Sequence, residues 1–133
     1  MFRVYDKQNK KWIKNNVYIS TDGDLYILKN SIFSGTKLEL LSEGMYVYHE
    51  SINLYDKEDV LVYEGDYIKA KVSKDKTVIG LVAYAHELSA YVILCINSDE
   101  FYTLGSEVCE FIKVVGNVFD GLNEEEQDVN EAL

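Results

Sequence analysis

The sequence predicts an all-β protein built around a small antiparallel SH3-like barrel formed by roughly residues 54–120. Three observations predict this class. Of the 133 residues, 11 are Tyr and five are Phe, and aromatic residues favour strands as Val and Ile do. Apolar and polar residues alternate with a period of two in several short runs. The chain has no proline, so Gly, Asn, Asp and Ser must form its turns.

The first 50 residues are expected to form β-hairpins that pack on this barrel. Residues 2–6 alternate weakly and lead into a polar turn, after which residues 12–13 resume the apolar pattern. Residues 17–19 and 25–28 are rich in β-branched and aromatic side chains, and an Asp-Gly pair lies between them. Such a pair between two strand-forming runs is a strong hairpin signal, because both positions tolerate a positive φ.

The segment 29–59 gives weaker signals. Residues 31–35 suggest a short strand and a turn, and residues 37–41 fit either a strand or one helical turn. Residues 45–48 are a strand candidate. Residues 51–59 are polar and end in a charged run, which predicts an exposed turn.

The clearest strand signal lies at residues 67–72. Ile68 and Ala70 share one face of this strand, and Lys69 and Lys71 share the other, which is the pattern of a half-buried strand. Further strands are expected after it, separated by polar segments, with a single helical or 3-10 turn. The expected ranges are 78–84, 91–96, 101–104 and 111–119 for the strands and 106–110 for the turn.

Five residues are assigned a structural role: Glu64, Gly65, Asp66, Gly116 and Asn117. Gly65 supplies an unusual φ to a tight turn, and Asp66 can accept hydrogen bonds from the amides of that turn. Gly116 interrupts a predicted strand, and an isolated strand glycine indicates a bulge or a barrel corner.

The net charge is −10 and is unevenly distributed. Residues 1–122 are expected to form one domain, whereas the acidic residues 123–133 have little to bury and are expected to be disordered. No apolar run approaches the roughly 18 residues that span a bilayer, and the N-terminus lacks the apolar core of a signal peptide. We therefore expect a cytoplasmic protein with no membrane partner.

Two basic clusters are candidates for contact with nucleic acid, although the acidic net charge disfavours that partner. Cations beside strand aromatics can track and stack a single strand. A position in the hydrophobic core explains Trp12 equally well, and protection of a sheet edge explains Lys69 and Lys71. The candidate residues are Arg3, Lys10, Lys11, Trp12, Lys69 and Lys71.

No arrangement of residues predicts catalysis, a cofactor or a metal. Cys95 and Cys109 are far apart without CxxC spacing, and His49 and His86 each stand beside a single Glu, which is not the spacing of a metal site. Cys95 lies in an apolar strand, where burial would keep its thiol protonated and inert. We therefore expect a protein that is not an enzyme.

Three blocks of sequence, at residues 2–13, 54–68 and 114–120, occur in an order and spacing that covers nearly the whole chain. Together they resemble the YopX-like family of small proteins encoded by bacteriophages and prophages. The chain departs from the family pattern because it lacks the proline that often follows the closing strand. The resemblance implies a β-rich, homo-oligomeric protein, and it implies no reaction and no catalytic residues.

We expect a non-catalytic accessory protein of the bacterial host cytoplasm that acts by protein–protein contact, with copies of itself or with a host protein. The surplus of Tyr motivates this hypothesis, since Tyr is favoured at interfaces. The alternative is a module that binds nucleic acid, or an acidic mimic of nucleic acid.

Overall fold

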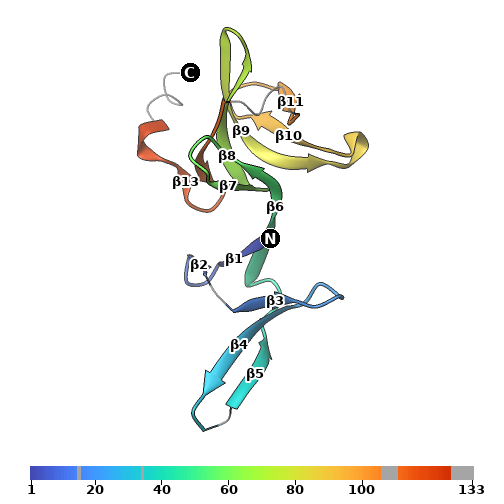
Figure 1. The fold of residues 1–133 in the computed structure, drawn as a ribbon, viewed down its shortest axis with the longest axis vertical. Coiled ribbons are helices and arrows are strands. Elements are labelled where there is room, and N and C mark those ends of the chain that lie inside the picture. The colour runs from blue at the N-terminus through green and yellow to red at the C-terminus, as the bar shows by residue number, and fades with distance from the viewer. Residues whose placement is uncertain (15, 34, 106–110, 127–133) are drawn as a thin grey trace. The chain divides into compact units, whose positions relative to one another are not determined.

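The computed structural model describes residues 1–14, 16–33, 35–105 and 111–126. Strands dominate the described chain, which confirms the all-β prediction. Its residues form two compact units, one of residues 2–49 and one that contains Met1 and residues 50 onward (Figure 1). We describe each unit by itself, as the N-terminal and the C-terminal unit.

The N-terminal unit consists of antiparallel hairpins, and both predicted hairpins are confirmed. β1 pairs with β2, so that Tyr5 lies opposite Trp12, and β4 pairs with both β3 and β5. Gly23, in the predicted Asp-Gly turn, has a φ of 88°. The strands of this unit are β1 (Phe2–Asp6), β2 (Lys11–Ile13), β3 (Val17–Ile19), β4 (Leu25–Ser31), β5 (Gly35–Leu40) and the first residues of β6 (Tyr46–Tyr55).

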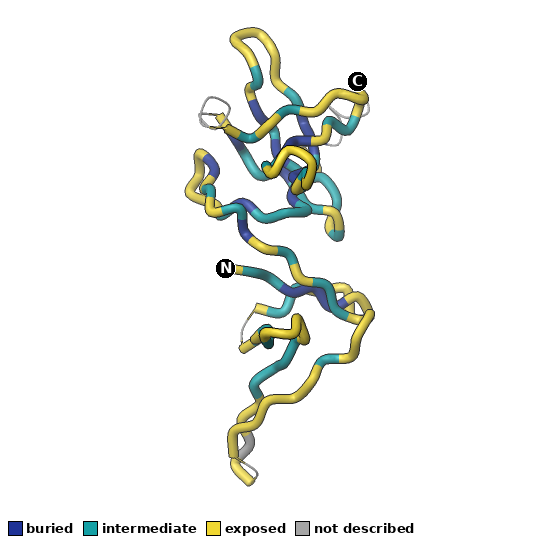
Figure 2. The backbone as a smooth tube through the Cα atoms, turned by 90° about the vertical axis from the view of Figure 1, so that its right-hand side faces the viewer, coloured by how far each residue is buried: buried dark blue, intermediate teal, exposed yellow. Residues whose placement is uncertain are grey.

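The segment with the weakest sequence signals forms a long hairpin. β4 continues to Ser31, and β5 is a strand rather than a helical turn. The apolar residues Ile32 and Phe33 lie in the connecting turn and are each 97% exposed, so the short strand expected at this point is instead the tip of the hairpin. Every residue of β5 is exposed, and the β4–β5 arm is largely exposed in Figure 2.

The C-terminal unit is built on one six-stranded antiparallel sheet that curls into a half-barrel, in the order β11-β10-β9-β8-β12-β13. The last part of β6 pairs with β7. The elements that follow β6 are β7 (Leu61–Tyr63), β8 (Asp66–Ser73), β9 (Lys76–Ala85), the 3-10 turn η1 (His86–Leu88), β10 (Ala90–Cys95), β11 (Phe101–Thr103), β12 (Ile112–Asn117) and β13 (Gly121–Leu122).

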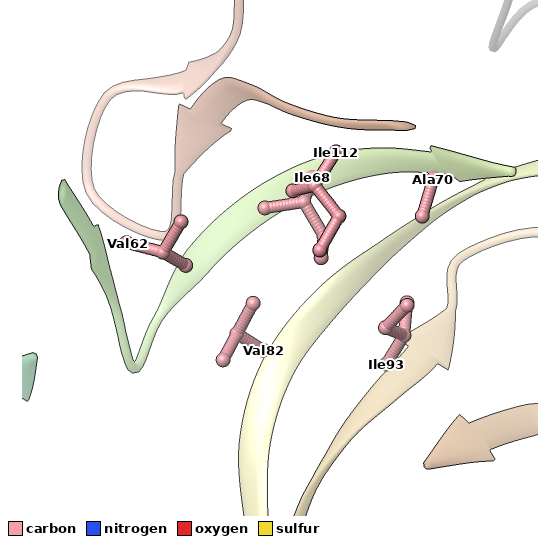
Figure 3. Close-up of a cluster of buried hydrophobic side chains, with 6 residues drawn as sticks. All are labelled: Val62, Ile68, Ala70, Val82, Ile93 and Ile112. Carbon is pink, nitrogen blue, oxygen red and sulfur yellow. The ribbon is translucent and has the colours of Figure 1, made fainter. Parts of the chain in front are cut away.

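The core of this unit lies on the concave side of the curled sheet, where side chains from five strands meet (Figure 3). Ile68 and Ala70 of β8 are completely buried, as the period-two pattern predicts. Burial of a side chain such as that of Ile68 contributes about 2 kcal/mol. The members of the core cluster are Val62, Ile68, Ala70, Val82, Ile93 and Ile112.

The predicted irregularity at Gly116 is confirmed. The register between β12 and β8 shifts between Val114 and Gly116, and Gly116 has a φ of 151°. A Cβ atom at Gly116 would overlap the carbonyl oxygen of Gly121. Glycine is therefore required for β13 to fold back against β12.

The predicted exposed turn at residues 51–59 is wrong in two respects. β6 continues through Tyr55, and Asp56 is only 6% exposed. The Asp56 carboxylate accepts the backbone N–H groups of Glu58 at 2.8 Å, Val60 at 2.9 Å and Val114 at 2.9 Å. Asp56 therefore joins the turn after β6 to strand β12, a long-range role that its position in a charged run conceals.

Of two other predictions, one falls wholly and one partly outside the described residues. The turn expected at 106–110 lies outside them, as do residues 127–133 of the predicted acidic tail. Within the described part of that tail, Asn123 donates its N–H to the carbonyl of Val115 at 2.7 Å, and Glu126 is 6% exposed.

We expect the substitution Asp56→Ala to lower the free energy of unfolding by about 3 kcal/mol, because three backbone N–H groups lose a charged acceptor. Urea unfolding of the variant and of the wild type measures this difference. Asp75→Ala, at an exposed position between β8 and β9, is the matched control and should change the free energy by less than about 0.5 kcal/mol.

The effect of Asp56 should also depend on pH. Burial by itself raises the pKa of Asp56, but the amides of Val114, Val60 and Glu58, with the charge of Lys113, outweigh it and lower that pKa below its ordinary value. Stabilisation from a lowered carboxyl pKa is complete above the unfolded pKa of about 4 and is lost as pH falls through the folded pKa. The stability difference between wild type and Asp56→Ala should therefore shrink below about pH 4, and a constant difference would contradict this account.

Candidate functional site

The predicted Glu64-Gly65-Asp66 motif forms the turn between β7 and β8. Gly65 has a φ of 83° and donates its N–H to the carbonyl of Val82 at 2.9 Å. Asp66 is 1% exposed and accepts the N–H of Tyr63 at 2.9 Å. Burial, followed by the nearby charge of Glu50, raises the pKa of Glu64. These hydrogen bonds of Gly65 and Asp66 organise the backbone of the turn.

Asn117, at the end of β12, organises a second turn. Its Oδ1 accepts the N–H groups of Phe119 at 3.0 Å and Asp120 at 2.9 Å, and its Nδ2 donates to the carboxylate of Asp120 at 2.9 Å. The structure thus places Asn117 and Gly116 side by side at the β12–β13 connection, where both act on the backbone.

The N-terminal basic candidates separate into two groups. The guanidinium of Arg3 lies over the Trp12 ring at 4.3 Å, and Trp12 also packs against Tyr5 at 5.0 Å and His49 at 6.1 Å between ring centroids. We call Arg3, Tyr5, Trp12 and His49 the aromatic cluster. Lys10 and Lys11 are exposed at the β1–β2 turn, outside these ring contacts.

A hollow of about 470 Å³ lies beside the aromatic cluster. Its lining includes Trp12 and Lys11 from the β1–β2 hairpin and Ile27, Lys29 and Glu39 from β4 and β5. Lys29 and Glu39 form an ion pair across the hairpin at 2.8 Å. The hollow therefore carries charges of both signs, two of which already pair with each other.

The second basic cluster is extended by residues that the sequence does not mark. Lys69 of β8 lies directly opposite Lys113 of β12, and Lys71 of β8 places its ammonium 5.3 Å from the Phe111 ring centroid. A groove of about 260 Å³ runs along these residues, and we call it the lysine groove. Its lining residues are Lys57, Lys69, Lys71, Thr77, Phe111, Lys113 and Glu126.

Two further lysines near the β8–β9 turn, Lys74 and Lys76, lie outside this groove. Lys74 is exposed in the connecting turn. Lys76 contacts the carboxylate of Glu100 at 2.7 Å, and the Tyr102 hydroxyl donates to the same oxygen at 2.6 Å. The hydrogen bond to Glu100 is the main cause that raises the pKa of Lys76.

A third surface lies on one face of the β3–β4–β5 sheet. Tyr18 is 51% exposed, Leu38 56% and Leu40 59%. The cross-strand pairs Tyr18–Tyr26, Tyr26–Leu40 and Leu28–Leu38 place five apolar or aromatic side chains on the same face. We call these five residues the apolar hairpin face.

Potential metal ligands do not cluster in the described part of the chain. Within residues 1–14, 16–33, 35–105 and 111–126, no three His, Cys, Asp or Glu side chains gather as metal ligands would. Cys95 is a half-buried free thiol, and Cys109 lies outside the described residues. No helix in the described part of the chain has the length and apolar character needed to cross a membrane.

The aromatic cluster makes a testable electrostatic prediction. Burial, and then the positive charge of Arg3, lower the pKa of His49 below its ordinary value of 6.5. We expect the imidazole to titrate below pH 6.5 in an NMR experiment, and the substitution Arg3→Gln to raise the midpoint because it removes a nearby positive charge.

The fluorescence of Trp12, the single tryptophan of the chain, gives an independent measurement. Its intensity should change over the same pH range, and His49→Gln should abolish that change. A wild-type midpoint at or above pH 6.5 would contradict the arrangement of the cluster.

Comparison with known proteins places the chain in a family. No curated protein sequence matches it. Among solved structures, the chain is similar to one described as the crystal structure of protein EF1440 from Enterococcus faecalis, with 19% sequence identity, a TM-score of 0.50 and coverage of 96% of this chain and 95% of that one. This likeness concerns the fold. The family model described as YopX protein matches residues 1–122, and the chain therefore belongs to the YopX protein family.

Proposed function

We propose that this chain is a non-catalytic accessory protein that acts by protein–protein contact and assembles with copies of itself through strand β5. The observation that carries the proposal is that β5 is an edge strand and that all six of its residues are exposed. In the described sheet, β5 pairs with β4 on one side. An exposed edge strand offers its other row of backbone groups to a further strand.

The apolar hairpin face supports assembly at this edge. Leu38 and Leu40 of β5 are more than half exposed, and Ile32 at the tip of the same hairpin is 97% exposed. Apolar side chains gathered on one exposed sheet face indicate an interaction site. A second sheet that continues from β5 would extend this face and shield part of it from water.

The sequence of β5 is complementary to itself in the antiparallel direction. If two copies of β5 pair about a two-fold axis at Leu38, each Lys37 lies opposite Glu39 of the second copy, and Leu38 lies opposite Leu38. Opposite charges in directly facing positions each stabilise an antiparallel pair by about 0.2–1 kcal/mol. The same register places Thr36 opposite Leu40.

The charged side chains on β4 and β5 of one copy favour pairing with β5 of a second copy. Lys37 lies directly opposite Lys29 on β4, and like charges in that position are destabilising. Glu39 pairs with Lys29 at 2.8 Å, whereas Lys37 forms no ion pair within the described part of the chain. Glu39 of a second copy would supply the opposite charge that Lys37 lacks.

The wider biological setting is part of the same proposal. Membership of the YopX family supports a phage or prophage origin, since the proteins that the chain resembles are encoded by such elements. The free thiol of Cys95 supports the reducing cytoplasm of a bacterial host. A host protein is the alternative partner for the same apolar face.

Charge reversal tests the two-fold register. Lys37→Glu and Glu39→Lys should each weaken self-association about tenfold, because each variant places like charges opposite one another at two symmetric positions. An equimolar mixture of the two variants should restore association, since the charges in the mixed pair are again opposite. Sedimentation equilibrium over a dilution series measures both effects.

Two leucine substitutions test whether the apolar hairpin face is the interface. Leu38→Lys should abolish self-association, whereas Leu88→Lys, at a position of similar exposure in η1 (51% against 56%), should not. A wild-type mass of one chain at all concentrations would refute the proposal. Equal association of all four variants would place the interface elsewhere.

A further inference from the structure

The lysine groove has a charge arrangement that the fold alone does not favour. Lys69 and Lys113 occupy directly opposing positions on β8 and β12, where like charges destabilise a sheet. Lys57 lies beside β12, because its backbone N–H donates to the carbonyl of Ile112 at 2.9 Å. Three ammonium groups are thereby brought to one side of β12, although the chain as a whole is acidic.

Carboxylates only partly neutralise these lysines. Lys69 lies 3.5 Å from Glu126, and Lys113 lies 3.8 Å from the exposed Glu58. Within the described residues, Lys57 and Lys71 form no ion pair. The groove therefore retains an excess of positive charge that an anionic ligand could neutralise.

Glu126 is held in the groove by the fold. Its N–H donates to the carbonyl of Asn123 at 2.9 Å, and Asn123 in turn donates to Val115 of β12 at 2.7 Å. The Glu126 side chain is only 8% exposed, whereas that of Lys69 is 40% exposed. A buried carboxylate next to Lys69 occupies a position that another anionic group could take.

Phe111 adds an aromatic surface to the groove. Phe111 immediately precedes β12 and is 55% exposed, and the Lys71 ammonium lies over its ring. An exposed aromatic ring next to cations that follow a groove is the arrangement that binds single-stranded nucleic acids by base stacking and phosphate contact.

We propose that the lysine groove binds single-stranded nucleic acid, with phosphates on Lys69, Lys71 and Lys113 and a base stacked on Phe111, and that Glu126 competes with one phosphate for Lys69. An acidic peptide would use the same lysines but would gain little from Phe111. The aromatic surface therefore favours a nucleic-acid strand as the ligand.

The binding experiment uses the full chain and a fluorescein-labelled oligothymidine, followed by fluorescence anisotropy between about 50 and 200 mM salt. Three phosphate contacts predict a slope of about −2 in a plot of log affinity against log salt concentration, since each contact on a single strand contributes about −0.7. Absence of binding at the lowest salt concentration would overturn the proposal.

Charge variants locate the site. Lys71→Glu should weaken binding about tenfold and reduce the salt slope, because it removes one phosphate contact and adds a repelling charge. Lys74→Glu makes the same charge change at an exposed lysine of the β8–β9 turn, outside the groove, and should have a much smaller effect. Equal losses in both variants would show that binding is non-specific and would overturn the assignment.

Two further variants test the aromatic contact and the competing carboxylate. Phe111→Leu should weaken binding several-fold without changing the salt slope, and Glu126→Gln should tighten it several-fold. Thermal unfolding of each variant checks that the fold is intact. If polyglutamate displaces the oligonucleotide at equal charge concentration and Phe111→Leu has no effect, the groove is a site for acidic peptides and the proposal is wrong.

Discussion

Strand β8 is hydrogen bonded along both edges, to β9 and to β12. The alternation of its side chains determines which residues lie on each face of the six-stranded sheet. Ile68 and Ala70 are completely buried among the core residues, so Lys69 and Lys71 must point to the opposite face. A slip of one residue would bury two lysines and expose the core positions, at a cost of several kcal/mol. The basic face is thus a direct consequence of the buried one.

Strand β12 must also be held in one register, because only that register places Lys113 opposite Lys69. A polar contact within the strand and a bulge near its end hold this register. The Asp56 carboxylate accepts the N–H of Val114, and the bulge at Gly116 shifts the pairing before β13 folds back. The turn residues that look purely structural in the sequence therefore position the side chains of the lysine groove.

The sequence was most informative where the signal is local. The Asp-Gly hairpin and the alternation at residues 67–72 each depend on neighbouring residues, and the structure confirms both. The position of Asp56 depends on an amide 58 residues away in the chain, which no local pattern encodes. For the same reason, Lys69 and Lys71 were predicted from the sequence as candidate contacts, whereas Lys113 and Phe111 were not. Cross-strand register determines which residues line the groove beside Lys69 and Lys71.

The net charge of −10 is compatible with a nucleic-acid groove, because salt screens the distant acidic side chains from a strand bound in the groove. At physiological salt the Debye length is about 8 Å, so a bound strand responds chiefly to the charges within the groove. Self-association through β5 would add a second effect. Each copy would contribute one groove, and several weak grooves on one strand bind more tightly than one, because later contacts form at a high effective concentration. A groove with only three or four cations is therefore sufficient if assembly repeats it.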